Sequence, residues 1–412
     1  MKKKLFVLDL KPFDLYLEYL KSSDEMGFNL IQITEDSKVY KDFTDHGLES
    51  NVIRLEEISP KSVLEAIIDD NKCMDTIFTE SERCIDIVRE IYNDSRYLGA
   101  ELLSELTPRS KNLMRELFKE KGINQANWFK VSSEKNINYS EVSKNFNFPL
   151  IIKPESGFSS FGVKKCLDID SLAKQAKRID LYNMLVLKEF SKSGNGIIVE
   201  EFITGKEYSV DTYWINGVPI QSFILTRGEQ QEDTFPDDLY YYDPKLAPEI
   251  EEAILDISCQ IGHCFNVKDG VTHSEVIVTK ENQVFAIESS PRGGAGGMFN
   301  KLFSAVSCEN TFKLRLLPLV SQKENVEFKS KLSDEYYFFI QPQIERSGKF
   351  AAVPANLRDK FLDITCFLRP GEKWNGSKNE INYFIWALGS CKKFQEIIEY
   401  KNFLEQNEEL ME

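Results

Sequence analysis

The sequence predicts an α/β protein built from several α+β subdomains, and three observations support this. Apolar strands alternate with helical patterns near the N-terminus, antiparallel hairpin patterns occupy the middle of the chain, and short strands return near its end. The chain has 412 residues, which is several times what one hydrophobic core requires. We therefore expect a parallel N-terminal sheet followed by antiparallel units.

The N-terminal region carries the strand–helix alternation of a parallel sheet. A helical pattern at 60–70 stands between two of the strands, as a crossover between parallel strands requires. No G-x-G-x-x-G follows the first strand, so we expect a scaffold or a substrate wall rather than a dinucleotide site. The expected strands are 5–8, 28–34, 51–55 and 75–79.

The middle of the chain combines capped helices with hairpins. Residues 107–122 have the start and stop signals of a helix, with Ser110 as the expected cap and Gly122 as the terminator. Asn216-Gly217 and Glu281-Asn282 are the expected turns of two antiparallel hairpins. These patterns predict antiparallel strands on either side of each turn.

The end of the chain is predicted to be a small β-rich unit. A helix at 248–265 precedes the second hairpin, and the charged stretch 321–335 is typical of a linker or an exposed turn. Strand patterns follow it, and residues 384–412 are expected to end the chain as a helix.

Composition narrows the class of protein. Lys and Arg number 51 against 66 Asp and Glu, which gives a net charge of −15. Such a surface repels nucleic-acid phosphates and anionic lipids, so neither is an expected partner. The eight cysteines form no C-x-x-C pair, and no apolar run approaches the length of a membrane span, so we expect a cytoplasmic protein with reduced thiols.

The first chemical cluster is a lysine at a strand end followed by a Gly/Ser loop. PLIIKP ends an apolar strand with Lys153, and ESGFSSFG follows at once. Glycines and serines let the backbone fold tightly and point N–H and O–H donors at an anion. The loop misses the P-loop pattern because Val163 stands where its lysine belongs. On its own such a loop is more often an ordinary connection.

The second cluster places two carboxylates on one hairpin. Glu275 and Glu288 lie on consecutive strands, where an antiparallel register brings them side by side. Their repulsion is relieved when a cation sits between them. Arg292 lies four residues further on and is suited to clamp an oxyanion. The competing interpretation is a pair of exposed hairpin carboxylates.

The third cluster, IVEEFITGKEYSVD, is nondescript alone, but together with the other two it resembles the ATP-grasp superfamily of carboxylate–amine ligases. The match runs from about Lys111 to Arg292 and is similar to the L-amino acid ligase and biotin carboxylase-like branches. The resemblance implies an N-terminal α/β domain, a two-lobed ATP-grasp centre and a β-rich C-terminal unit. The expected limits are 1–105, 106–190 for the first lobe, 191–320 for the second lobe, and 321–412.

The resemblance also implies an ATP site. Two lysines in it hold the phosphates and the Gly/Ser loop closes over them. Glu200 accepts from the adenine amino group, its aliphatic and aromatic neighbours frame the ring, and Glu207 binds ribose. The implied residues are Lys111, Lys153, Ser159, Ser160, Gly162, Glu200, Phe202, Ile203 and Glu207.

A magnesium site and a catalytic arginine follow from the same resemblance. Glu275 and Glu288 hold two Mg²⁺ ions, with Mn²⁺ as a substitute, and Arg292 steadies the transferred phosphoryl group together with Lys153. Ser290 stands where the family often has Asn, so its hydroxyl is the third implied metal ligand. The glycines of RGGAGG (293–297) let backbone amides approach a substrate carboxylate.

Two residues remain open between a catalytic and a structural role. His273 precedes Glu275 by two positions on one strand, so both side chains point the same way. It is expected to act as a base for the incoming amine or to orient Glu275, or else to be structural. Arg227 is expected either in the same cleft or in a surface ion pair.

The implied reaction is amide or peptide bond formation through an acyl phosphate, with ATP as the energy source and small carboxylate and amine substrates. A biosynthetic role and a homodimer are the expected setting. Three alternatives stay open: a carboxylase or purine-pathway relative that phosphorylates bicarbonate, a ligase that acts on a protein or carrier-protein acceptor, and an inactive ATP-binding regulator.

Overall fold

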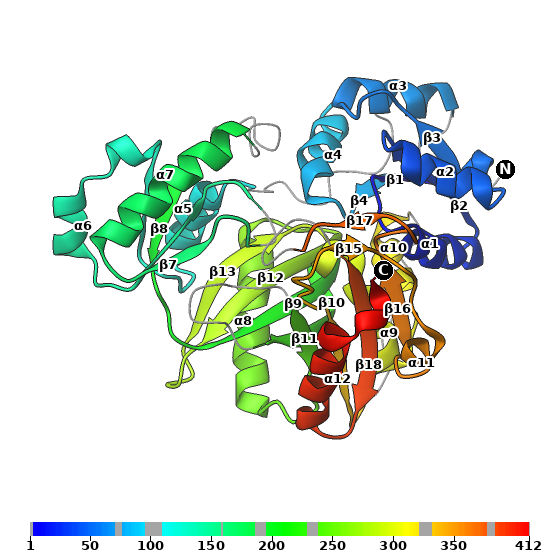
Figure 1. Ribbon diagram of the computed structural model, residues 1–412. Coiled ribbons are helices and arrows are strands. Elements are labelled where there is room, and N and C mark those ends of the chain that lie inside the picture. The colour runs from blue at the N-terminus through cyan, green and yellow to red at the C-terminus, as the bar shows by residue number, and fades with distance from the viewer. Residues whose placement is uncertain are drawn as a thin grey trace.

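The computed structural model describes residues 3–70, 76–94, 109–157, 160–185, 195–228, 238–320, 332–376 and 384–411. Four sheets organise these residues: a parallel N-terminal sheet, a small four-stranded antiparallel sheet, a large antiparallel sheet and a two-stranded antiparallel ribbon (Figure 1). In Figure 1 the small sheet lies to the left of the large sheet, and the N-terminal sheet lies above the large sheet. The mixed α/β class expected from the sequence is confirmed.

The N-terminal sheet has four parallel strands in the order β3-β2-β1-β4. Its apolar strands occupy the predicted positions to within two residues; β1, β2 and β4 bury side chains on both faces of the sheet, whereas the edge strand β3 has Ile53 partly buried and Arg54 exposed. The strands are β1 (Lys3–Leu8), β2 (Phe28–Thr34), β3 (Val52–Arg54) and β4 (Thr76–Thr79), and the helices are α1 (Phe13–Glu25), α2 (Ser37–Asp45), α3 (Pro60–Asp70) and α4 (Ile85–Tyr92).

The small sheet, which we call the first lobe, is antiparallel with the order β5-β8-β6-β7. One apolar cluster joins its inner face to helix α7, so the lobe has a core of its own. Its elements are β5 (Trp128–Val131), α6 (Tyr139–Asn145), β6 (Leu150–Pro154), β7 (Lys164–Cys166), α7 (Ile169–Leu185) and β8 (Ile197–Glu201).

Helix α5 (Lys111–Lys121) precedes the first lobe in sequence but packs elsewhere. The Ser110 side chain caps it and Gly122 ends it in the left-handed conformation at φ 70°, as the sequence predicts. Met114 and Phe118 share a core with α8 (Pro248–Cys264) of the large sheet. The helix therefore carries its side chains into the space between the two sheets.

The large antiparallel sheet has eight strands in the order β13-β12-β9-β10-β11-β14-β18-β16. The expected turn at Asn216-Gly217 is present, with both residues at positive φ, and Asn282 turns the second hairpin in the same way. The strands are β9 (Lys206–Ile215), β10 (Val218–Arg227), β11 (Leu239–Tyr242), β12 (Gly270–Val278), β13 (Val284–Ser290), β14 (Tyr336–Ile340), β16 (Asp363–Cys366) and β18 (Ile385–Cys391).

The last strands of the chain extend this sheet, and here one expectation was wrong. Residues 384–391 were expected in the terminal helix, but Ile385–Cys391 is a strand between β14 and β16. An apolar run that is buried on both faces has no periodicity that separates a strand from a helix. The terminal helix is α12 (Phe394–Gln406).

The remaining elements cover or fringe the large sheet. A continuous apolar cluster packs α1 of the N-terminal unit against α9 and α10 and the sheet, so these parts share one core. The elements are α9 (Phe299–Ser307), α10 (Thr311–Leu316), β15 (Gly348–Lys349), α11 (Ala355–Arg358) and β17 (Lys373–Trp374). Among the helices of the described residues, none is long and apolar enough to cross a membrane.

We predict that Gly262→Ala in α8 destabilises the protein. A Cβ at this position would overlap the Trp214 indole, which is fully buried on β9. Ala normally stabilises a helix interior by about 0.5–1 kcal/mol relative to Gly, but overpacking costs about 1–3 kcal/mol. Urea unfolding should show a net loss of stability.

The double variant Trp214→Phe/Gly262→Ala is the control for this prediction. The smaller ring removes the atoms that the new methyl group would strike, so the penalty of Gly262→Ala should shrink in that background. An equal penalty in both backgrounds would contradict the steric explanation.

Candidate active site

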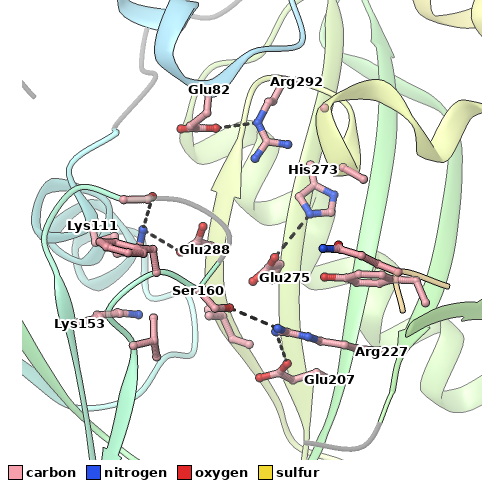
Figure 2. Close-up of a pocket in the computed structure, with 18 of the residues that line it drawn as sticks. Glu82, Lys111, Lys153, Ser160, Glu207, Arg227, His273, Glu275, Glu288 and Arg292 are labelled. Carbon is pink, nitrogen blue, oxygen red and sulfur yellow. Dashed lines mark hydrogen bonds and ion pairs between the residues drawn. The ribbon is translucent and has the colours of Figure 1, made fainter. Parts of the chain in front are cut away.

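One cavity of about 760 Å³ lies where the first lobe, the large sheet and the N-terminal unit meet. This volume falls within the range of roughly 300–1,000 Å³ that is usual for small-molecule sites. It gathers most of the residues that the resemblance singles out, although they come from segments far apart in the sequence (Figure 2). They are Lys111, Lys153, Ser160, Glu200, Phe202, Ile203, Glu207, His273, Glu275, Glu288 and Arg292.

Three expected residues are not part of that lining. Ser159 lies outside the described residues. Gly162 stands just behind the lining loop at φ 76°, where an added Cβ would lie 3.0 Å from the Pro154 ring. The Ser290 hydroxyl donates to Glu82 Oε2 at 3.0 Å, so it is directed to the N-terminal unit.

A buried triad joins α5 to the first lobe. Glu200 Oε1 accepts from Arg115 Nε at 2.7 Å, and Glu200 Oε2 pairs with Lys153 Nζ at 2.7 Å. Burial acts to raise the pKa of Glu200, but the charges of Arg115 and Lys153 outweigh it and hold the pKa at about 2. Burial lowers the pKa of Lys153, and the charge of Glu200 opposes that shift.

The hairpin carboxylates lie side by side, as the sequence predicts. Glu275 and Glu288 are register partners on β12 and β13 and face the cavity together (Figure 2). Lys111 Nζ lies 3.1 Å from Glu288 Oε2 and donates to the Gly157 carbonyl at 3.1 Å. The β-bulge directly after Glu275 marks the point where the strand pairing shifts beside this pair.

These carboxylates fit a magnesium site that is completed by phosphate and water. Mg²⁺ is usually held by one or two carboxylates plus substrate phosphates rather than by an all-protein cage. The described residues contain no group of three or more His, Cys, Asp or Glu side chains suited to a metal. Ser290 as a third ligand stays a prediction.

His273 stands between two carboxylates. Its Nδ1 lies 2.6 Å from Asp211 Oδ1, and its Nε2 lies 3.6 Å from Glu275 Oε1. Burial acts to lower the pKa of His273, but Asp211 outweighs it and raises the pKa to about 9. For Glu275, burial acts to raise the pKa, but the neighbouring His273 and the charge of Arg227 outweigh it and lower the pKa to about 2. An imidazolium with these partners orients Glu275 and is poorly suited to accept a proton.

Arg227 faces the cavity and links the large sheet to the loop that precedes β7 of the first lobe. Its Nη1 lies 2.7 Å from Glu207 Oε2, and its Nη2 donates to Ser160 Oγ at 3.3 Å (Figure 2). Arg227 is only 7% exposed, so the surface ion pair is excluded. The loop that follows Lys153 is therefore tied to β10 on the opposite side of the cavity.

The N-terminal unit supplies carboxylates that sequence reasoning missed. Glu82 Oε2 pairs with Arg292 Nε at 2.6 Å, and Arg109 lies 3.6 Å from the other oxygen. Burial acts to raise the pKa of Glu82, but the charges of Arg292 and Arg109 lower it. Glu82 thus fixes the guanidinium that we expect to meet the transferred phosphoryl group.

Glu80 and Asp211 hold the glycine-rich segment after Arg292. Glu80 is 1% exposed and accepts from Gly293 N at 2.7 Å, from Arg315 Nε at 2.6 Å and from the Tyr19 hydroxyl at 3.0 Å. Asp211 Oδ2 accepts from Gly294 N at 2.8 Å. These two amides were expected to meet a substrate carboxylate, but protein carboxylates already engage them.

Some residues of this network could have been predicted from the sequence. Glu80 and Glu82 directly follow the predicted strand 75–79, and ligands bind near the carboxyl ends of parallel strands. Arg115 lies one helical turn after Lys111 on the same face of α5. No sequence pattern indicated a role for Asp211 in the site, apart from its position as an acidic residue inside an apolar strand.

Comparison with known proteins agrees with this geometry. Residues 146–301 match the family model described as an ATP-grasp domain, so the resemblance expected from the sequence is confirmed. The D-alanine–D-alanine ligase of Bacillus anthracis is 27% identical over 126 residues, which are 31% of this chain and 38% of that protein. D-alanine–D-alanine ligase A of Escherichia coli (strain K12) is 26% identical over 232 residues, which are 51% of this chain and 57% of that protein.

Solved structures extend the likeness to the whole fold. The L-amino acid ligase of Bacillus licheniformis superposes with a TM-score of 0.78 at 18% identity, over 98% of this chain and 97% of that chain. Biotin carboxylase of Campylobacter jejuni gives 0.70 at 11% identity, over 97% and 90%. The chain matches 38% and 57% of the length of these two curated relatives, so activity and substrates are matters of proposal.

We predict that Glu200→Gln removes a pH-dependent part of stability. The pKa of Glu200 is about 2 in the folded chain against an ordinary 4.5, so the ionised triad stabilises the fold above pH 4.5. That contribution, about 3 kcal/mol by linkage, is lost as the pH falls from 4.5 towards 2. Urea midpoints of the two proteins should therefore differ most near neutrality and converge in acid.

Glu201→Gln is the matched control, because Glu201 is the next residue and its carboxylate bonds the Asn127 amide at the surface. Its effect should be small at every pH. A constant gap between wild type and Glu200→Gln across the acid range would contradict the low pKa of Glu200.

Proposed function

We propose that this protein is an ADP-forming ligase that joins a small carboxylic acid to an amine through an acyl phosphate. The observation that carries the proposal is the convergence of Lys111, Lys153, Glu275, Glu288 and Arg292 on one cavity. Phosphoryl transfer needs positioning and charge neutralisation more than covalent help from the protein. The match to the ATP-grasp domain and the ligase names of the relatives support the same class.

The residues divide the work by position. Lys111 and Lys153 hold nucleotide phosphates, Ser160 and its loop cover them, and Phe202 with Ile203 frames a flat ring against the first lobe. Glu200 lies near Lys153, and it accepts a hydrogen bond from the adenine amino group. Each of its carboxylate oxygens still has a free lone pair after one has bonded Arg115 and the other Lys153. Glu207 holds ribose, and Arg227 fixes its carboxylate.

Magnesium is the cation that the hairpin carboxylates are suited to hold. Bound there, it would neutralise phosphate charge and orient the reacting oxygens. Glu275 and Glu288 supply the ligands, His273 keeps Glu275 ionised and oriented, and Lys111 reaches both Glu288 and the phosphate loop. Arg292, fixed by Glu82, stands ready for the charge that develops on the transferred phosphoryl group.

We predict that Glu288→Gln lowers ADP release by about a hundredfold or more, since removing one charge-stabilising group typically costs about 3 kcal/mol. The assay is ADP and phosphate release on pairs of the twenty amino acids, with bicarbonate and simple diamines as further arms. Release with bicarbonate alone would instead favour the carboxylase-like alternative.

The control is Glu281→Gln, an exposed carboxylate at the turn of the same hairpin. It should leave ADP release unchanged, because it lies outside the described lining of the cavity. Full activity of Glu288→Gln would refute its role as a metal ligand.

We also predict that Mg²⁺ with ADP raises the melting temperature, and that Mg²⁺ alone raises it much less. In the ligand-free fold Lys111 already pairs with Glu288 and His273 with Glu275, so Mg²⁺ alone gains little, whereas a ligand at 100 times its Kd stabilises by about 2.7 kcal/mol. Differential scanning fluorimetry measures the shift. In the double variant Glu275→Gln/Glu288→Gln, Mg²⁺ should no longer add to the stabilisation that ADP gives. An unchanged melting temperature of the wild type at millimolar Mg-ADP would contradict the nucleotide site.

A further inference from the structure

One end of the cavity is walled by aromatic rings that the nucleotide and the metal carboxylates do not use. Tyr240 on β11 packs on Phe299 of α9 with ring centroids 4.8 Å apart, and Phe299 lies 6.3 Å from Phe339 on β14. Phe339 packs edge-on against Trp386 of β18 at 4.7 Å, and Phe367 lies 5.7 Å from Trp386. All five rings line the cavity, and we call them the aromatic wall.

The aromatic wall directly adjoins the reaction centre. The Phe299 ring lies 5.9 Å from the His273 ring, and His273 contacts Glu275. An added Cβ on Gly294 would overlap the Phe299 ring, so the backbone just after Arg292 rests on the wall. A carboxylate held for phosphorylation near Arg292 would thus place its substituent against these rings.

The polarity of the cavity changes from one end to the other. The nucleotide end holds the buried ions Lys153, Glu200 and Arg227, whereas the aromatic end adds the neutral amide of Gln341, whose buried Oε1 has no hydrogen-bond partner among the described residues, and the exposed Lys373 and Asn375. Bicarbonate has no substituent and alanine only a methyl group, so neither would extend far along the rings that line this end. Burying apolar surface contributes about 25 cal/mol per Å², which favours a large apolar substituent at this end.

We propose that the acid substrate carries a large apolar side chain, of phenyl or similar size, which the aromatic wall binds. This inference rests on the proposed function and names the class of acid that it activates. The wall then acts as the specificity-determining surface, while the polar end of the cavity treats all acids alike.

The test is calorimetric binding of acids to the full-length protein saturated with Mg²⁺ and a non-hydrolysable ATP analogue. The acids are both enantiomers of phenylalanine, 3-phenylpropanoate, alanine, aspartate and bicarbonate. At least one phenyl-bearing acid should bind about tenfold or more tightly than alanine, because hydrophobic pockets discriminate at that scale. Equal or tighter binding of alanine, aspartate or bicarbonate, or no binding of any phenyl-bearing acid, would overturn the proposal.

Phe367→Ala separates the wall from general packing. Phe367 is partly buried, and its loss should weaken phenyl-acid binding about tenfold while the affinity for the ATP analogue stays unchanged. Phe403→Ala on α12 is the matched control, since Phe403 is also partly buried but outside the described lining. Equal effects of the two variants on acid binding would overturn the assignment.

The result also separates this inference from the proposed function. Failure of the ATP analogue to bind would remove the proposed function and this inference with it. If the analogue binds and ADP is released with small acids but not with phenyl-bearing acids, the proposed ligase function is supported. That result would overturn only the aromatic specificity.

Discussion

Pairing of buried charges across separate elements is the constraint on which the cavity depends. A buried carboxylate is tolerated only beside a cation or strong donors, because its desolvation is costly. Glu200 of the first lobe pairs with Arg115 of α5, Glu82 of the N-terminal unit with Arg292, and Glu80 with Arg315. Each pair joins segments that are far apart in the chain, so the same contacts that satisfy the charges also set how the units meet.

This pairing explains how the cavity can be ready for a polyanion while it holds so many acids. Lys111 contacts Glu288 and Lys153 contacts Glu200, so the lysines that we expect to meet phosphate are already oriented. Under the proposed function, phosphates and a divalent cation would exchange partners with these groups and require little reorganisation. Such preorganised charges are the main source of rate enhancement in many enzymes.

Local chemistry was predictable from the sequence, and long-range pairing was not. The pairing of Glu275 with Glu288 follows from a hairpin whose turn the sequence indicates at Glu281-Asn282. In the same way, Ser110 indicates the start of helix α5, because its side chain caps that helix. The partners of Glu200 and Arg292, in contrast, lie 85 and 210 positions away. Strand β18 was misread because burial on both faces erased its periodicity. No pattern within a window of residues encodes contacts of that range.

The glycines after Arg292 show why the N-terminal unit is more than a scaffold. A Cβ on Gly293 would lie 3.1 Å from Glu80 Oε2, and one on Gly297 would lie 2.9 Å from Glu80 Cγ and 3.2 Å from the Tyr19 hydroxyl. On its other side the segment presses against Phe299 at Gly294. Side chains are therefore excluded by close packing between the N-terminal unit and the aromatic wall. The shape of the acid site that we propose depends on both surfaces, because a shift of either one would move the backbone that lies between them.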